Sequence, residues 1–241
     1  MEIIPAIDII GGQCVRLTQG DYKQMTIYAK NPLDIALQFC DAGIRRLHLV
    51  DLDGAKAGHI INYKTIELIA DKTPLVIDFG GGLNSQDDLR IAFESGAKMI
   101  TGGSIAVREP ETFRQWLGTF GPEKIILGAD ARNGKIAIKG WQEESELTIS
   151  QLINRYKADG IDKIICTDIS KDGAMKGPSF ELYNNLMGEF PDLKFIASGG
   201  ISCFEDVVKL KINGMYGAII GKAIYEKTIS MKQLEQLAMD N

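Results

Sequence analysis

Two aspartates are placed where paired carboxylates could perform acid–base chemistry. Asp8 directly follows the apolar run 3–7, and Asp130 directly follows the run 125–129, half a chain later. Two carboxyl groups can divide the roles of acid and base when their surroundings separate their pKa values. A single aspartate at such a position could instead cap the next helix. Because the two positions match, we expect Asp8 and Asp130 to be catalytic.

Glycine pairs offer a second kind of chemistry, the binding of phosphate. Backbone N–H groups without side chains around them can converge on phosphate oxygens beside a helix N-terminus. The first cup would consist of Gly81, Gly82, Gly102, Gly103 and Ser104, and the second of Ser198, Gly199, Gly200, Gly221 and Lys222. Glycines that serve only tight turns are the alternative. Two cups imply a small-molecule ligand with a phosphate at each end, held by local amides despite a net charge of −5.

Other reactive residues are few. His48 lies in an apolar run and His59 in a loop, so a histidine metal site or a Ser-His-Asp triad lacks parts. We expect no metal and no cofactor, and we expect His48 to pack in the barrel interior. Lys56 and Lys171 lack apolar surroundings that would depress an amine pKa, so we interpret them as solvated loop residues. Trp141 follows the short apolar segment 136–138 and could stack on a planar ligand.

Hydrophobic patterning predicts the elements that position these residues. Eight apolar runs alternate with helical patterns: 2–7, 46–50, 75–79, 98–101, 124–129, 163–167, 194–197 and 217–220. Their isoleucine- and valine-rich character is typical of strands that helices cover on both faces. The sequence therefore predicts an α/β fold, a single (β/α)8 TIM barrel, with an open doubly wound sheet as the alternative. Strand ends meet at the mouth of such a barrel, which would place Asp8 opposite Asp130.

An internal repeat supports the barrel. Landmarks recur at a spacing of 117 or 118 residues: Gly43 with Gly160, Gly81 with Gly199, and Gly96 with Gly214. An ordered series at one spacing indicates a duplicated half barrel. We expect one domain over residues 1–241, with halves of about 1–120 and 121–241.

Capping patterns mark several helix starts. They are Asn31 with Pro32, Thr148 with Gln151, Ser202 with Glu205, and Ser230 with Gln233. In each pattern the first-named residue is expected to be the N-cap of the helix that follows.

Composition excludes several classes of protein. The chain has 45% hydrophobic and 24% charged residues, as globular domains do, and its four cysteines form no CxxC pair. No basic run supports nucleic-acid binding, no apolar stretch is long enough for a membrane span, and the first residues do not resemble a secretory leader. We expect a cytoplasmic monomer.

Several motifs resemble the phosphoribosylformimino-aminoimidazole carboxamide ribotide isomerases of histidine biosynthesis. They are IPAID at 4–8, VRLTQGDY at 15–22, LVDLDGA at 49–55, TDISKDG at 167–173 and GKA at 221–223. The match spans the whole chain. The motif that runs from IPAID to VRLTQGDY is long and specific, whereas the glycine motifs are shared with a sister cyclase and with many phosphate-binding barrels.

The resemblance implies an Amadori rearrangement, in which the ribose ring of an aminoaldose phosphate opens and becomes the aminoketose. It implies no cofactor and a substrate with a phosphate at each end. In this pattern Asp8 is the base that removes the proton from C2 of the sugar. Asp130 is the acid that protonates the ring oxygen, and Asp172 is its rival for that role.

The resemblance also adds binding residues. Thr167 would be a positioning hydroxyl, and Trp141 would stack on the imidazole carboxamide. The binding set further includes Arg16, Gly20, Asp172, Gly173 and Gly177. The family's arginine after the third-strand glycines is Asn84 here, so the first cup would rely on Arg16 or on amides alone.

Three other functions stay open. The sister cyclase, a lyase that receives ammonia from a glutaminase, typically has cysteine at the position of Ala6. An isomerase that also accepts phosphoribosyl anthranilate would perform the same rearrangement. The third alternative is a catalytically silent phosphoribosyl-binding regulator, and both aspartates argue against it.

Overall fold

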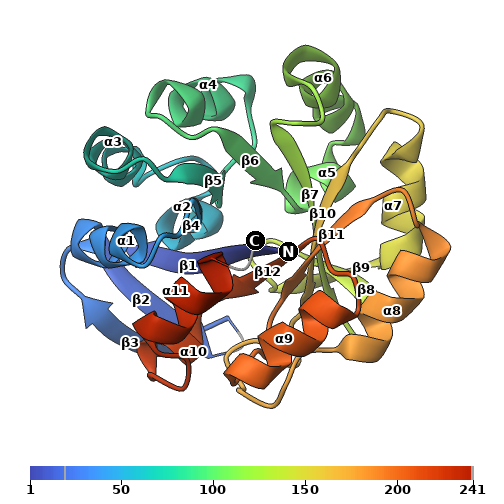
Figure 1. Cartoon of the computed structure of the whole chain (residues 1–241). Coiled ribbons are helices and arrows are strands. Elements are labelled where there is room, and N and C mark those ends of the chain that lie inside the picture. Colours follow the sequence, from blue (N-terminus) through green and yellow to red (C-terminus); the bar gives the residue numbers. More distant parts are fainter. Residues whose placement is uncertain (19, 240–241) are drawn as a thin grey trace.

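The computed structural model describes residues 1–18 and 20–239, which form a closed ring of parallel strands surrounded by helices (Figure 1). The barrel strands are β1 (Glu2–Ile10), β4 (Arg46–Asp51), β5 (Val76–Gly80), β6 (Met99–Gly102), β7 (Ile125–Arg132), β10 (Lys163–Asp168), β11 (Lys194–Ser198) and β12 (Gly217–Ile220). Each pairs in parallel with the next, and β12 pairs with β1 to close the ring. The predicted (β/α)8 barrel is confirmed, and the open sheet is wrong.

Helices follow the barrel strands and cover the outside of the ring (Figure 1). They are α1 (Pro32–Asp41), α3 (Tyr63–Lys72), α4 (Gln86–Glu94), α6 (Pro110–Phe120), α7 (Ile149–Lys157), α8 (Phe180–Glu189), α9 (Phe204–Ile212) and α11 (Met231–Met239). Shorter helices α2 (Leu52–Ala57), α5 (Ser104–Arg108) and α10 (Lys222–Tyr225) begin within two residues of the ends of β4, β6 and β12. The short helices therefore lie at the end of the barrel where the predicted chemistry belongs.

Each half of the chain opens with an antiparallel hairpin extension. The first consists of β2 (Gln13–Thr18) and β3 (Asp21–Ala29), and β2 pairs with the end of β1. The second consists of β8 (Lys135–Ile138) and β9 (Glu143–Thr148), and β8 pairs with the end of β7. Both halves thus share the order of a barrel strand, two antiparallel strands and a helix. Only β8 was indicated by the sequence, because β3 and β9 are largely exposed and lack an apolar run.

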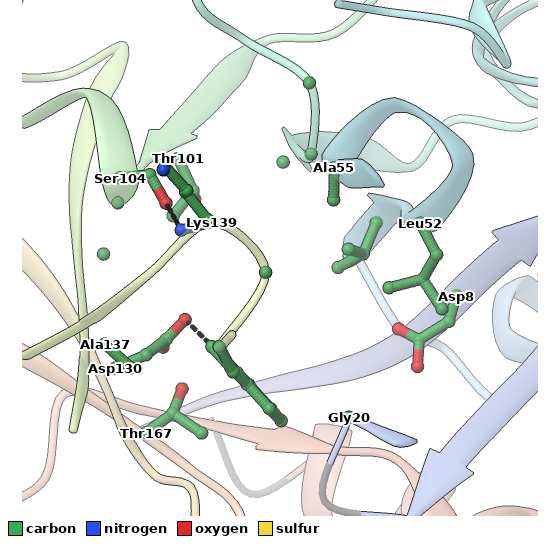
Figure 2. A pocket seen from close by; sticks show the side chains of 18 of the residues that line it. Asp8, Gly20, Leu52, Ala55, Thr101, Ser104, Asp130, Ala137, Lys139 and Thr167 are labelled. Atoms are coloured by element: carbon green, nitrogen blue, oxygen red, sulfur yellow. Dashed lines mark hydrogen bonds between the residues drawn. The ribbon is translucent and has the colours of Figure 1, made fainter. Parts of the chain in front are cut away.

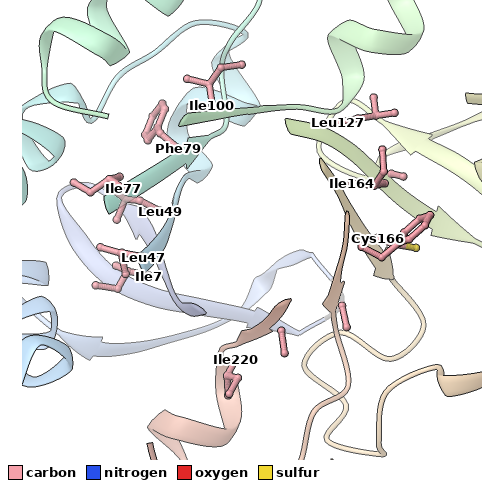
Figure 3. Packing of buried hydrophobic residues seen from close by; sticks show 14 of the residues in the cluster. Ile7, Leu47, Leu49, Ile77, Phe79, Ile100, Leu127, Ile164, Cys166 and Ile220 are labelled. Carbon is pink, nitrogen blue, oxygen red and sulfur yellow. The ribbon is translucent and has the colours of Figure 1, made fainter. Parts of the chain in front are cut away.

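Side chains of the barrel strands alternate between the interior and the helices. The inner cluster consists of Ile4, Ala6, Met99, Ile126, Ile165, Ile196 and Ile219. The outer cluster includes Ile7, Leu49, Phe79 and Leu127, which Figure 3 shows among the other side chains packed around the ring. On β1 the inward series runs from Ile4 to Asp8, and on β7 it runs from Ile126 to Asp130. The alternation therefore brings both aspartates to the open end of the interior.

Three of the four predicted helix starts are confirmed. Asn31 caps α1, Thr148 and Gln151 form a capping box on α7, and Ser230 and Gln233 exchange the same bonds before α11. The pairing of Ser202 with Glu205 is wrong. Cys203 is the N-cap of α9, and the Ser202 hydroxyl instead donates to Asp206 Oδ2 at 2.8 Å.

Asp51 anchors the segment that follows β4. Its fully buried carboxylate accepts hydrogen bonds from the backbone N–H groups of Gly54, Ile61 and Asn62, each at 2.8 Å, and from the Asn62 amide at 2.7 Å. Gly81 of the first cup packs directly on Asp51, since its φ is +95° and a Cβ there would lie 2.2 Å from the Asp51 carbonyl oxygen. Position 81 therefore requires glycine, and Asp51 fixes the backbone on which it rests.

We expect Asp51→Ala to lower the free energy of unfolding by about 3–4 kcal/mol, because it leaves several largely buried N–H donors without an acceptor. Urea unfolding followed by circular dichroism measures the change. The control Asp71→Ala, at an exposed position of α3, should change stability by no more than about 0.5 kcal/mol. Equal stability of the two variants would contradict the anchoring role.

Candidate active site

The C-terminal ends of the barrel strands surround a cavity of about 440 Å³. Thirteen of the expected site residues line it: Asp8, Arg16, Gly20, Gly81, Gly82, Gly102, Gly103, Ser104, Asp130, Trp141, Thr167, Asp172 and Ser198. Figure 2 shows Asp8 and Asp130 projecting from opposite sides, with Thr167 beside Asp130. A concave site of this size at this end of a barrel is typical of small-molecule enzymes.

A buried arginine lies between two carboxylates of the cavity. Nη1 of Arg16 is 2.8 Å from Oδ2 of Asp8, and its Nη2 is 3.8 Å from Oδ1 of Asp172. The exposed fractions of the three side chains are 11% for Arg16, 14% for Asp8 and 15% for Asp172. The first hairpin extension brings Arg16 here, because Val15 of β2 pairs in register with Asp8 of β1.

Burial controls the protonation of this group. Removal from water raises the pKa of the Asp8 carboxyl, while the positive charges of Arg16 and His48 oppose the rise. Removal from water also raises the pKa of Asp172 to about 6, against the charge of Arg16 and reinforced by Asp8 and Asp130. Burial acts against the charge of Arg16, yet the two carboxylates still raise the pKa of its guanidinium. Asp8 has the close cationic partner, so Asp172 is the better placed of the two to carry a proton.

Asp130 has a different environment. Its Oδ2 accepts the indole N–H of Trp141 at 2.8 Å, and its register partner on β10 is Thr167. The Trp141 ring packs on Gly20, where φ is +77° and a Cβ would lie 2.7 Å from ring atom Cε3. Gly20 belongs to the turn of the first hairpin extension and Trp141 to that of the second, so the two extensions meet at the cavity wall. Because an indole N–H can only donate, Asp130 acts here as an acceptor.

His48 lines the cavity as well as packing in the barrel interior. Its Nδ1 lies 2.9 Å from Oδ1 of Asp78, which also accepts the hydroxyl of Thr101 at 2.8 Å. Burial opposes a charged imidazole, but the Asp78 carboxylate raises the pKa of His48. Burial opposes the charge of Asp78 too, yet His48 and Arg46 lower its pKa. Sequence reasoning missed this polar group, although its members occupy inward positions of otherwise apolar strands and could have been found by that alternation.

The first cup opens on the main cavity, and its own polar groups are mainly backbone. Ser104 Oγ accepts the backbone N–H of Lys139 at 2.8 Å. Asn84, which stands where the resembled family has arginine, donates from Nδ2 to the Gly58 carbonyl at 3.0 Å. Besides Arg16, the lysine and arginine side chains that line the cavity in the described residues are Lys56, Arg108 and Lys139. Lys56 lies in α2 rather than in a loop, and none of the three was expected to bind.

The second cup is a small hollow that adjoins the cavity. Its walls include Arg16, Asp172, Gly173, Ser198, Gly199, Gly200, Gly221 and Lys222. Lys222 Nζ donates to the Gly173 carbonyl at 3.0 Å. Arg16 was expected near the first cup, but it lies at the second. A Cβ at Gly221 would be only 2.3 Å from Nη2 of Arg16. Gly177 lines neither cup, and its N–H donates to the Gly200 carbonyl at 3.0 Å, which supports the second cup from behind.

Within residues 1–18 and 20–239, no three His, Cys, Asp or Glu side chains gather as a set of metal ligands. None of the helices in these ranges has the length and apolar character that crossing a membrane requires.

Comparisons with known proteins agree over the length of the chain. A family model described as histidine biosynthesis protein matches residues 2–230. A relative from Flavobacterium psychrophilum is 58% identical over 240 residues, which cover 100% of both chains. It is named 1-(5-phosphoribosyl)-5-((5-phosphoribosylamino)methylideneamino) imidazole-4-carboxamide isomerase. Relatives with that name from Cytophaga hutchinsonii and Bacteroides fragilis are 56% and 52% identical and are covered over 98% of both chains. The chain belongs to the histidine biosynthesis protein family.

Proposed function

We propose that this protein is the aldose–ketose isomerase of histidine biosynthesis named by its relatives. It converts 1-(5-phosphoribosyl)-5-((5-phosphoribosylamino)methylideneamino)imidazole-4-carboxamide to the phosphoribulosyl isomer by an Amadori rearrangement. The observation that carries the proposal is the cavity in which Asp8 and Asp130 face each other beside two glycine cups. The full-length relatives at 52–58% identity support the same reaction, and none of those described above is named a cyclase.

Two phosphates fit the construction of the site. One would bind at the Gly81–Ser104 end and the other at the Gly199–Lys222 end, which belong to different halves of the chain. Trp141 lies on the wall between hairpin extensions, where its ring would stack on the imidazole carboxamide. Binding through local amides and a few cations is compatible with a chain of net charge −5. We propose that the enzyme works as a cytoplasmic monomer.

The rearrangement needs one acid and one base. The acid gives its proton to the ribose ring oxygen, the bond from that oxygen to C1 breaks, and a protonated imine forms at C1. The base then takes the proton from C2, and the resulting enaminol becomes the aminoketose. Asp8 suits the base, because Arg16 at 2.8 Å holds it ionised while burial raises the pKa of its carboxyl. Both effects together give a charged carboxylate of increased basicity.

Two carboxyls compete for the role of the acid. Asp130 is engaged as an acceptor by the indole of Trp141. Asp172 has no cation within hydrogen-bond distance in the described residues, and removal from water raises its pKa to about 6. These contacts favour Asp172 as the acid and give Asp130 the task of orienting Trp141 and the substrate. The assignment of the acid to Asp130 by family resemblance stays open to the following test.

We expect Asp8→Asn and Asp172→Asn each to lower kcat by about 10²- to 10⁴-fold, because each removes a positioned proton transfer. Asp130→Asn should lower kcat less, since its amide oxygen can still accept the Trp141 N–H. Spectroscopic turnover of the aminoaldose substrate measures all three. A larger loss in Asp130→Asn than in Asp172→Asn would assign the acid to Asp130, and normal turnover of Asp8→Asn would overturn the mechanism. Parallel assays with phosphoribosyl anthranilate test the broader substrate range.

The pH dependence should show the acid directly. The pKa of Asp172 is raised to about 6 by burial, so the protonated form that donates is lost as the pH rises through that value. We expect kcat/KM, which reports groups of the free enzyme, to fall with rising pH above about 6 in the wild type. Steady-state kinetics across the pH range measures this alkaline limb, the fall of kcat/KM with rising pH. A limb of unchanged position in Asp172→Asn would exclude this carboxyl as its source.

A further inference from the structure

The two ends of the Arg16 guanidinium have different partners. Nη1 is hydrogen-bonded to Asp8 at 2.8 Å. Nη2 is 3.8 Å from Asp172, which exceeds hydrogen-bond distance, and it is the nitrogen that lies nearest to the position of a Cβ on Gly221. Nε is buried and has no hydrogen-bond partner within residues 1–18 and 20–239. Nη1 is therefore committed to Asp8, while Nη2 and Nε are the donors that a ligand could engage.

Arg16 also joins the two hollows of the site. It lines the main cavity together with Asp8 and the second cup together with Gly221 and Lys222. A planar guanidinium can hold a carboxylate with one edge and a phosphate oxygen with another, because its N–H groups point in fixed directions. A phosphate in the second cup would meet Nη2 and leave the bond from Nη1 to Asp8 in place.

This geometry has a consequence for the carboxyl pair. We propose that phosphate bound in the second cup engages Nη2 of Arg16 and offsets the positive charge that Arg16 presents to Asp172. Asp172 then takes up a proton, while Asp8 stays ionised. The proton comes from solvent and is the one that Asp172 then donates to the ring oxygen. Arg16 is in this respect a positioning residue, and the inference rests on the proposed isomerase function.

The other charged groups around Asp172 either favour its protonation or oppose it only weakly. The charged or titratable side chains that face it are Arg16 on β2, Asp8 on β1, Asp130 on β7, Lys222 on α10 and Tyr183 on α8. Asp8 and Asp130 already favour a protonated Asp172, and a phosphate dianion adds further negative charge. Lys222 favours the ionised form, but it belongs to the second cup and would also be engaged by the phosphate. Binding should therefore move the pKa of Asp172 upward from about 6.

Sulfate is the appropriate probe, because it is a dianion that does not titrate in the range of interest. We expect sulfate to inhibit competitively and to bind with net uptake of protons between about pH 6 and 8, tightening as the pH falls. The affinity for sulfate should be about tenfold higher with Asp172 protonated than with Asp172 ionised for each unit by which binding raises the pKa of Asp172. Isothermal titration calorimetry in buffers of different ionisation enthalpy counts the protons.

Three variants separate this coupling from simpler effects. Asp172→Asn should bind sulfate without proton uptake, because the titrating group is absent. Arg16→Lys keeps the charge but offers one point instead of a fork, so the uptake per bound sulfate should fall well below that of the wild type. The matched control Lys222→Ala should weaken sulfate binding but keep more of the uptake than Arg16→Lys, because Lys222 acts on Asp172 more weakly than Arg16 does. Circular dichroism checks that each variant is folded.

The outcomes distinguish the inference from the function on which it rests. Sulfate that binds the wild type without proton uptake, or with equal uptake in Asp172→Asn or Arg16→Lys, overturns the coupling and leaves the isomerase proposal standing. Sulfate that fails to compete with the substrate removes the second cup as a phosphate site and overturns the inference, whereas absence of aminoaldose turnover by the wild type overturns the isomerase proposal. As a second readout, the alkaline limb of kcat should lie at higher pH than that of kcat/KM in the wild type, and the two should approach each other in Arg16→Lys.

Discussion

Closure of the barrel brings the aspartates of β1 and β7 together at one end of the ring. Every barrel strand is hydrogen-bonded on both sides, its outward side chains are covered by helices, and its inward side chains meet those of the opposite strands. Isoleucines such as Ile4, Ile126 and Ile165 fill the lower interior. Inward positions toward the C-terminal ends of the strands reach the open end, and on β1 and β7 they include Asp8 and Asp130. The opposition of Asp8 and Asp130 is thus a consequence of period-two alternation in a closed ring.

Burial of charged groups at this end of the barrel lowers the stability of the fold, and the proposed function accounts for their presence. Asp8 and Arg16 satisfy each other, but Asp172 has no cation within hydrogen-bond distance in residues 1–18 and 20–239 and remains largely buried. Its pKa is raised in the folded state by removal from water. Its contribution to stability is therefore fully present below the pKa of an unfolded aspartate and is lost as the pH rises through about 6. A carboxyl that resists ionisation weakens the fold at neutral pH, and the same property suits it to the proposed role of proton donor.

The sequence predicted those features that follow from local rules. All eight barrel strands could be predicted because buried parallel strands are continuous apolar runs, and the glycine cups because a backbone such as that of Gly81 tolerates no Cβ. The hairpin extensions could not be predicted in full, because β3 and β9 face solvent and carry no apolar pattern. Without β2 there was no basis for placing Arg16 between Asp8 and Asp172 at the second cup. The Ser202 cap was wrong because α9 begins one residue later, with Cys203 as its N-cap, and the Ser202 hydroxyl donates to Asp206.

The repeat explains the frame of the site and cannot by itself explain its chemistry. Equivalent elements place Asp8 and Asp130 alike, yet a reaction that needs one acid and one base requires unlike surroundings. The unlike residues are those that the repeat does not share. A spacing of 117 residues, which aligns Asp51 with Asp168, aligns Asp172 with Ala55. At the spacing of 118 residues, which aligns Gly81 with Gly199, Lys222 of the second cup aligns with Ser104 of the first, and Arg16 comes from one extension only. The asymmetry of the barrel therefore lies in Arg16, Asp172 and Lys222, the three side chains that gather around one glycine cup.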